Sequence, residues 1–391
     1  MNAEDYQSFA ESWEGRATIR TRPRRIVEND GKLIYPLSRQ PLVLSGTFQR
    51  ECPHLQDFAL TQSLYKFIND VVIFETEIVD RTARSIAKDR FPIRFPFACR
   101  YDAMTVVVDE DYHALVAMDY MQQTVALTGI EPIALPREIE LSRAIPATLA
   151  AVPASLHGAV ELICVSIAEN TLTNDVAAFA KDDSIKPSVK GLMADHLADE
   201  GRHSGFWARL ARIYWSAAGD KERQAIAAAM PTFLREYLTN EIQKDFDFSL
   251  IDHLDVSPSV RSALKEEVLG LVYPINRQHP LLGNILRFFR HSGMLDSPCL
   301  QDALSDYLLA SECNETSGNP TTGAQSCPAA ASGRAGGARA LGDPLRGCGG
   351  NAGPADRRRQ PATRQRLPRR APVAALACDD ARPATALPGQ R

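Results

Sequence analysis

Four long helix-periodic segments each carry a glutamate in the middle of their apolar face, and this feature limits the fold more than any other. The segments cover residues 61–89, 103–128, 156–181 and 187–217. Within each, apolar side chains recur at steps of three and four. The glutamates on these faces are Glu75, Glu110, Glu169 and Glu200. A buried, ionised carboxylate must be paired, neutralised or bound to a metal. The pattern therefore predicts an all-α bundle with four carboxylates inside.

Histidines on the same faces favour metal as the partner. Glu110 with His113, and Glu200 with His203, are both Glu-x-x-His pairs, which place a carboxylate and an imidazole one turn apart on one face. Two helices with Glu-x-x-His and two with a lone Glu make up the ligand set of di-iron and di-manganese carboxylate bundles. Oxygen and nitrogen ligands without thiolate suit iron or manganese better than structural zinc.

Each candidate also has a plainer interpretation. Glu77 competes with Glu75, and His196, one turn before Glu200, could be an ordinary core histidine. Asp109 and Asp111 flank Glu110, but only Glu110 has the three-residue Glu-x-x-His spacing to His113. A chain without a metal site would require all of these plainer interpretations to be true at once, so we favour the metal site. We expect the remaining helical-region histidines to be structural or at the surface: His157, His253, His279 and His291.

Charge and composition exclude several classes of partner. The first 310 residues hold 32 basic and 42 acidic side chains, and this acidic balance disfavours nucleic acid and anionic membranes. No run of 18 apolar residues predicts a membrane span. The first residues, MNAEDYQSFAESWEG, lack the apolar core of a secretory signal. None of the eight cysteines forms a CxxC pair, so we expect no disulfide framework and a cytoplasmic location.

The segments outside the four long helices divide the chain into three parts. Residues 1–60 are expected to form an N-terminal extension with a short extended arm, and 61–310 the bundle domain. Additional C-terminal helices are expected at 220–240, 258–272, 280–292 and 299–310. From residue 311 to 391 the chain is rich in Ala, Gly, Pro and Arg and has no Lys or aromatic residue. Such a low-complexity tail is expected to be disordered; the alternative is a GC-rich gene translated out of frame.

The motif around Glu200 resembles a known family. His196-x-x-x-Glu200-x-x-His203, with Glu169 and the Glu110-x-x-His113 pair upstream, is similar to the p-aminobenzoate N-oxygenase family over residues 60–300. The resemblance implies a ferritin-like four-helix bundle with two iron ions, dioxygen as co-substrate and an external electron donor. It also implies seven ligands. Glu110 and Glu200 would bridge the irons, Glu75 and His113 would complete one iron, and Glu169, His196 and His203 the other.

The resemblance further implies an activity. The expected reaction is oxidation of a substrate amino group to hydroxylamine, nitroso or nitro in natural-product biosynthesis, at the di-iron centre itself. The substrate would be a small-molecule or carrier-tethered amine, and the protein a homodimer. Asp195 and Asp199 are candidates to orient imidazoles, and Arg287 and Arg290 to hold a substrate carboxylate, although each could be simply solvated. The alternatives are a C-hydroxylase or oxidase on the same bundle and a non-enzymatic iron or manganese store.

Overall fold

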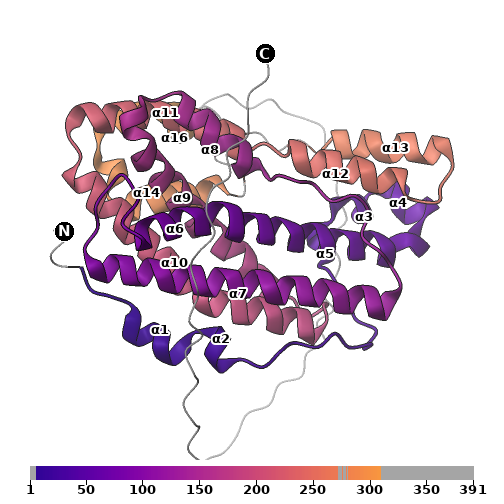
Figure 1. Cartoon of the computed structure of the whole chain (residues 1–391). Coiled ribbons are helices and arrows are strands. Elements are labelled where there is room, and N and C mark those ends of the chain that lie inside the picture. Colours follow the sequence, from indigo (N-terminus) through magenta and orange to yellow (C-terminus); the bar gives the residue numbers. More distant parts are fainter. Residues whose placement is uncertain (1–5, 272–274, 276–278, 280, 310–391) are drawn as a thin grey trace, which may run out of the picture. The chain divides into compact units, whose positions relative to one another are not determined.

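The four glutamate-bearing segments form helices that pack as two pairs (Figure 1). The computed structural model describes residues 6–271, 275, 279 and 281–309. In the first pair, α5 (Gln56–Ile73), η4 (Phe74–Val79) and α6 (Asp80–Ala87) follow one another along α7 (Phe97–Thr128). In the second pair, α9 (His157–Lys181) packs along α10 (Pro187–Ala217). The expected all-α, ferritin-like four-helix core is confirmed.

Local sequence signals set the ends of these helices. Pro187 is the first residue of α10, where proline lacks only an N–H that would have no partner in the helix. Gly129 ends α7 with φ at 69°, a left-handed conformation that favours glycine, and its N–H donates to the carbonyl of Val125 at 2.9 Å. Pro187 thus marks the beginning of α10, and Gly129 marks the end of α7.

The first long segment differs from the expected single helix. Between α5 and α6 the backbone takes a π-helical form over Phe74–Val79, which widens the helix by the equivalent of one residue. Glu75 lies in this segment and is buried, whereas Glu77 is exposed. Glu75 therefore faces the interior of the bundle, and its competitor Glu77 faces solvent.

The hydrophobic interior consists of two clusters, and the glutamates lie where they meet. On α7, Val107 belongs to one cluster and Ala117 to the other. On α10, Phe206 and Met193 divide in the same way. The polar residues between these positions therefore occupy the middle of the bundle, enclosed by apolar side chains at both ends.

Further helices cover the two ends of the core. α8 (Glu140–Ala150), α11 (Asp220–Tyr237), α14 (Leu282–His291) and α15 (Pro298–Ala303) pack around one end. α3 (Pro41–Leu44), α4 (Gly46–Glu51), α12 (Glu241–Asp252) and α13 (Pro258–Leu269) pack around the other. Neither α8 nor α12 was expected from the sequence, and the segment expected at 299–310 is divided into α15 and α16 (Ser305–Leu309).

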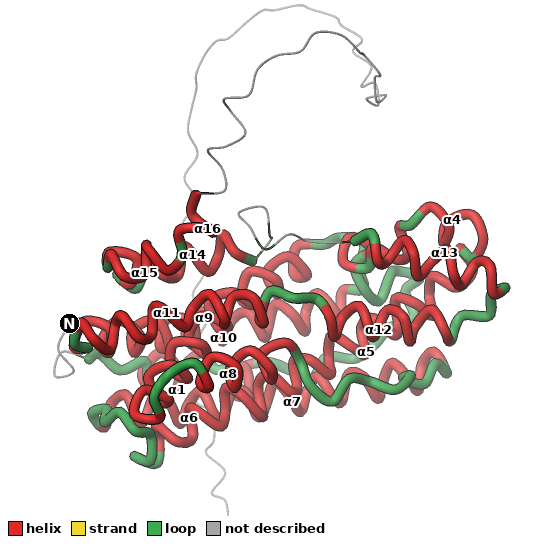
Figure 2. The backbone as a smooth tube through the Cα atoms, turned by 90° about the horizontal axis from the view of Figure 1, so that it is seen from above, coloured by secondary structure: helices red, strands yellow, loops and turns green. Residues whose placement is uncertain are grey.

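The N-terminal residues follow the bundle rather than leave it. α1 (Ala10–Arg16) and α2 (Thr18–Thr21) lie against α7 and α10 (Figure 1). In the expected extended arm, the one bridge among the described residues pairs Leu33 with Ile185, and Figure 2 shows helices and loops only. The proposed boundary at residue 60 stays a prediction. The tail 311–391, with both of its interpretations, lies outside the described residues.

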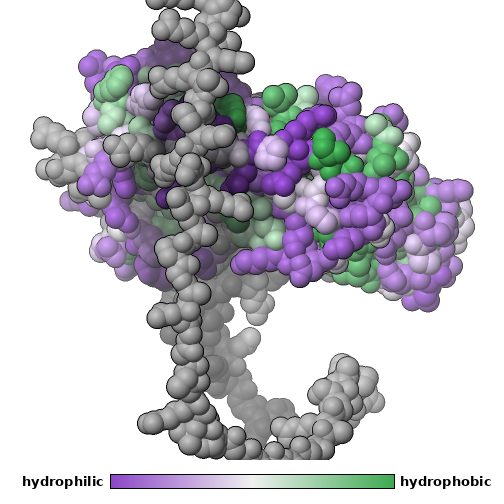
Figure 3. All heavy atoms as spheres, turned by 90° about the horizontal axis from the view of Figure 1, so that it is seen from below, coloured by the Kyte–Doolittle hydropathy of each residue, from purple (hydrophilic) through white to green (hydrophobic). Residues whose placement is uncertain are grey.

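α7 is apolar on two sides. Besides its buried face it exposes Phe97, Tyr101, Met104, Leu115 and Met118, which recur at helical steps on the side opposite Glu110. Hydrophobic residues reach the molecular surface on the face shown in Figure 3 as well, where they form patches among hydrophilic ones. Within the described part of the chain, no helix is long and apolar enough to cross a membrane, and the four cysteines found there are free.

Candidate metal centre

Seven side chains meet in the middle of the bundle, and they form two groups that share Glu200. The first group is Glu75, His113, His196 and Glu200; the second is Glu110, Glu169, Glu200 and His203. Within each group, one ligand atom per residue lies within 4.8 Å of the others. All seven are the residues that the sequence singled out, and they come from every one of the four long helices.

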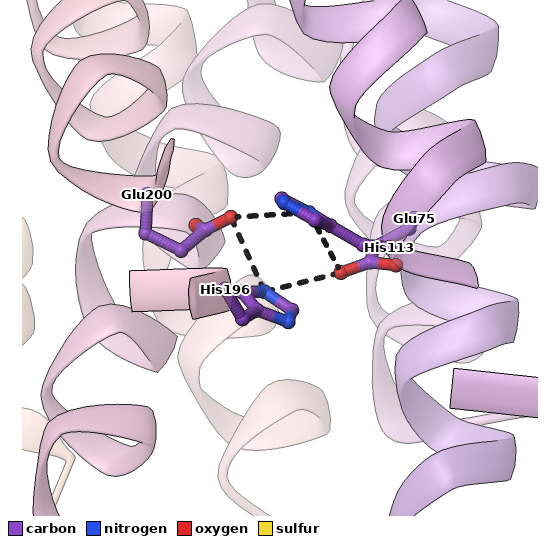
Figure 4. Close-up of side chains that lie close together, drawn as sticks. All are labelled: Glu75, His113, His196 and Glu200. Atoms are coloured by element: carbon purple, nitrogen blue, oxygen red, sulfur yellow. Dashed lines mark ion pairs between the residues drawn. The ribbon is translucent and has the colours of Figure 1, made fainter. Parts of the chain in front are cut away.

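The first group surrounds a space between η4, which carries Glu75, α7 and α10, and Figure 4 shows its four side chains facing one another. Nε2 of His196 lies 3.2 Å from Oε1 of Glu75 and 3.2 Å from Oε1 of Glu200. Nδ1 of His113 lies 3.7 and 3.9 Å from the same two oxygens. The four donors thus converge from three helices, which is how a bundle builds a metal site.

The second group centres on His203. Its Nδ1 lies 3.0 Å from Oε1 of Glu110 and 3.2 Å from Oε1 of Glu200, while Glu169 approaches from α9. Oε2 of Glu110 lies 3.1 Å from Nδ1 of His113. Glu110 therefore faces one imidazole with each oxygen, and Glu200 faces both groups, so both glutamates have the position needed to bridge two ions.

The structure groups His196 differently from the expectation. The resemblance implied that His196 belongs with Glu169 and His203, but the structure places it with Glu75 and His113. The rings of His196 and His113 stack with their centroids 4.3 Å apart. The reason is helical spacing: His196 lies one turn before Glu200 and His203 one turn after it, so the two imidazoles flank Glu200 on opposite sides.

The electrostatics of the site favour added positive charge. Burial raises the pKa of Glu75 to about 7, and burial together with the charges of Glu200 and Glu110 raises the pKa of Glu169 well above its usual range. For Glu110 and Glu200 burial acts in the same direction, but the nearby histidines together outweigh it and lower both pKa values: His203 and His113 at Glu110, and His203 and His196 at Glu200. Oε2 of Glu75 is buried and accepts no hydrogen bond from the described residues. These residues fit a pair of divalent cations, which would ionise all four carboxyls.

Two aspartates hold the imidazoles from behind. Nε2 of His113 donates to Oδ2 of Asp199 at 3.1 Å, and Nε2 of His203 donates to Oδ2 of Asp109 at 3.2 Å. Each imidazole therefore carries its proton on Nε2 in the neutral form and turns the Nδ1 lone pair toward the glutamates. Asp199 thus has the orienting contact expected of it. Asp195 does not, because it pairs with Arg25 at 2.6 and 2.8 Å.

The N-terminal segment completes this outer layer, and we call residues 6–25 the strap. Nε1 of Trp13 donates to Oδ1 of Asp109 at 2.8 Å, and the backbone N–H of Thr18 donates to Asp199 at 3.2 Å. The guanidinium of Arg202 donates to both aspartates, to Asp109 at 3.0 Å. The strap and Arg202 thus fix the two carboxylates that orient the imidazoles.

Sequence reasoning missed this layer, apart from Asp199. A signal for Asp109 was present: the tetrad Glu-x-x-His is preceded by Asp in both copies, at 109–113 and 199–203. Nothing in the local sequence of the strap predicts that Trp13 and Thr18 reach these aspartates, because the contacts span 96 and 181 residues.

A small cavity of about 30 Å³ lies beside the first group. His113 and His196 reach its inner end, and apolar side chains of α5, α7 and α10 form most of its lining. Strap residues Arg22, Pro23 and Arg25 form the outer wall. Arg287 and Arg290 are exposed on α14 and do not line it. The four histidines set aside earlier take no part in either group.

A four-helix bundle that brings four buried glutamates and three imidazoles together has the donor set of the carboxylate–histidine class of metal-binding bundles, in two groups that could each hold an ion. Its sequence gives the family: the chain belongs to the family described as p-aminobenzoate N-oxygenase AurF, whose model matches residues 3–269. The match includes all seven residues and the strap. A 4-aminobenzoate N-oxygenase from Streptomyces thioluteus is 22% identical over 237 residues, which cover 60% of this chain and 68% of that protein.

Proposed function

We propose that this chain is a non-haem di-iron monooxygenase that uses dioxygen to oxidise a substrate amino group to hydroxylamine, nitroso or nitro in natural-product biosynthesis. The observation that carries the proposal is the convergence of seven glutamate and histidine side chains, six of them buried and His196 partly buried, into two groups that share Glu200. Membership of the p-aminobenzoate N-oxygenase family supports the choice of an amine as the reacting group.

The grouping assigns a role to each ligand. Glu75, His113 and His196 would hold one iron, and Glu169 and His203 the other. Glu110 and Glu200 each lie beside an imidazole of both groups, and they would bridge the two irons. When bound, two ferrous ions would supply electrons and open positions for the reduction of dioxygen, with an external donor restoring them.

The surrounding residues prepare this chemistry. Asp109 and Asp199 hold two imidazoles in the tautomer that offers Nδ1 to a metal. The apolar clusters on both sides of the site exclude bulk water, which protects reactive species and strengthens the fixed electrostatics. The cavity at His113 and His196 marks the side from which a substrate amine would approach.

The substrate is proposed as a class. The named activity of the Streptomyces thioluteus relative makes an arylamine acid the first compound to test, and an amine tethered to a carrier protein remains within the same proposal. A homodimer in a cytoplasmic setting also stays a prediction, which sedimentation of the purified protein would test for the oligomeric state.

The test begins with protein purified from iron-supplemented cells. Metal per chain is counted, and the reduced protein is given 4-aminobenzoate under ¹⁸O₂, with products read by mass spectrometry. About two irons per chain and ¹⁸O on the nitrogen of the product support the proposal. Metal-loaded protein that leaves every amine tested unchanged would reject it.

The same experiment separates the alternatives. A C-hydroxylase would place ¹⁸O on carbon. An iron or manganese store would take up many more ions per chain than two and consume dioxygen without a substrate product. Replacement of Glu200 by alanine, which removes the residue shared by both groups, should abolish the two-iron stoichiometry and provides the negative control.

A further inference from the structure

The cavity beside the candidate metal centre has one wall unlike the others. Its α5 and α7 sides present apolar groups such as Phe67, Ile68 and Val116, whereas the strap presents Arg22 and Arg25. The imidazoles of the first group lie at the inner end. A molecule in this space would therefore meet imidazoles at one end, an apolar surface along its body and, at the outer wall, guanidinium groups together with the Asp195 carboxylate.

The charges on this wall do not balance. Arg25 binds Asp195 with two hydrogen bonds, at 2.6 and 2.8 Å, and satisfies the planar geometry of that carboxylate. Nε of Arg22 approaches the same carboxylate only to 3.4 Å, without a hydrogen bond. Two guanidinium groups thus face one carboxylate, and about half of the Arg22 side chain is exposed.

A comparison with Arg24 shows that uncommitted guanidinium donors are particular to Arg22. Arg24 donates through Nε to Asp119 at 2.7 Å and through a second nitrogen at 2.5 Å, and it does not line the cavity. Among the described residues, Arg22 alone of these three arginines keeps its donors uncommitted. It is therefore the cation on this wall that can bind a further anionic group.

We propose that Arg22 binds an anionic group, most simply a carboxylate, on the amine substrate and so determines which amines enter. The inference rests on the proposed function, since it assumes that the amine reacts at the inner end of this cavity. The anion would be held at the strap, the body would lie on the apolar lining, and the amino group would face His113 and His196. A guanidinium binds a carboxylate through two parallel hydrogen bonds, which also orients the molecule.

Binding must widen the cavity. Its 30 Å³ accommodates one or two waters, since a single water needs about 10–15 Å³ in this measure. Three of the walls are long helices, whereas the strap leaves its last helix at Thr21. Arg22 and Pro23 lie beyond the last helix of the strap and before Arg24 and Arg25, which Asp119 and Asp195 hold. Widening would therefore fall on this short stretch and on the half-exposed Arg22 side chain.

The test compares two probes of similar shape on iron-loaded, full-length protein kept free of oxygen, so that binding is measured without turnover. The probes are 4-aminobenzoate and its neutral analogue 4-aminobenzamide, and binding is followed by titration calorimetry. Wild-type protein should prefer the benzoate by about tenfold or more, as expected for a charge-assisted pair. R22Q should lose that preference by weakening benzoate binding only, and R22K should keep part of it.

R24Q is the matched control, because it removes an equal charge two residues away on the same strap without touching the cavity. It should keep the wild-type preference. The inference is overturned if wild type shows no preference for the benzoate, if R22Q keeps that preference, or if R24Q loses it equally. The last result would mean that the total positive charge of the strap, and not a contact with Arg22, governs the preference. Arg22-dependent benzoate binding in a protein that never oxidises the amine would reject the proposed function and leave the anion site standing.

Discussion

Asp199 accepts a hydrogen bond from Nε2 of His113 across the bundle, and its counterpart Asp109 accepts one from Nε2 of His203 in the opposite direction. Each aspartate directly precedes a glutamate of the site on its own helix. α7 and α10 therefore lock each other's imidazoles. A shift of one helix along the other would break both hydrogen bonds at once. The packing of α7 against α10 therefore fixes the direction in which the Nδ1 lone pairs of His113 and His203 point.

Replacement of Asp199 by asparagine should weaken metal binding. The amide can donate to Nε2 of His113 and so favour the tautomer with its proton on Nδ1, the atom that faces the glutamates. We expect a loss of about 10–100-fold in affinity for one of two Zn²⁺ or Fe²⁺ ions, measured by competition with a coloured chelator. Asp109→Asn should produce the equivalent loss through His203.

Asp195→Asn is the control for this pair. Asp195 lies one turn before Asp199 on α10 and is bound by Arg25, whereas the aspartates that accept from His113 and His203 are Asp199 and Asp109. The metal affinity of the Asp195→Asn variant should stay close to that of the wild type. An equal loss in Asp195→Asn would mean that negative charge near the site, and not the tautomer, governs affinity.

The strap should stabilise the fold through Trp13. Trp13→Phe keeps an aromatic ring but removes the N–H that donates to Asp109 at 2.8 Å. A hydrogen bond to a charged acceptor contributes about 1.5–3 kcal/mol, and this one is partly buried, so the thermal midpoint should fall by several degrees. Metal affinity should fall less than in Asp109→Asn, because Arg202 still donates to that carboxylate. An unchanged midpoint would show that the strap is not held by this contact.

Helical periodicity was sufficient to predict the centre of this protein. Glu75, Glu110, Glu169 and Glu200 could be found because a charged residue on an apolar face is unusual wherever the 3.6-residue period is clear. The group that His196 joins could not be found in this way, because it depends on how α10 lies relative to η4 and α7, which carry Glu75 and His113. The π-helical turn at Glu75 also leaves no sequence signal, since it changes only which backbone groups pair.

The missed helices have physical reasons as well. α8 contains Pro146 in its interior, a residue that usually ends a helix. α12 carries a charged or polar residue at most of its exposed positions and buries only a narrow stripe that includes Phe246 and Leu250. In both cases packing against neighbouring helices outweighs weak local preference.

Metal binding should release protons and strengthen as the pH rises. Burial opposes a charged His113, but hydrogen bonds to Asp199, Glu110 and Glu75 outweigh it and raise the pKa of the imidazole well above its usual range. Burial raises the pKa of Glu75 to about 7, and burial with the charges of Glu200 and Glu110 raises that of Glu169 well above its usual range. At neutral pH these groups hold protons that a cation must displace. Titration with Zn²⁺ in two buffers of different ionisation enthalpy should show about two to four protons released per chain. Binding with no net proton release would contradict these protonation states.

Asp247, a buried acid that belongs to neither group of candidate ligands, should make the fold less stable at high pH. Asp247 on α12 is 7% exposed, and burial raises its pKa to about 6, although Gln243, Gln40 and Lys66 act against the rise. The folded state therefore binds this proton more tightly than the unfolded chain. The stabilisation is complete below the unfolded pKa of about 4 and is lost as the pH rises through 6.

Asp247→Asn removes this dependence and keeps an oxygen that can accept from Nε2 of Gln243 and Gln40, which lie 3.1 and 3.3 Å from Oδ1. At pH 8 the variant should be more stable by up to about 3 kcal/mol, the equivalent of a shift of two pH units. At pH 4.5 its thermal midpoint should approach that of the wild type. Asp245→Asn, at an exposed position on the same helix, should change neither value. A variant less stable than wild type at both pH values would mean that hydrogen bonds to the carboxylate outweigh the penalty of burying its charge.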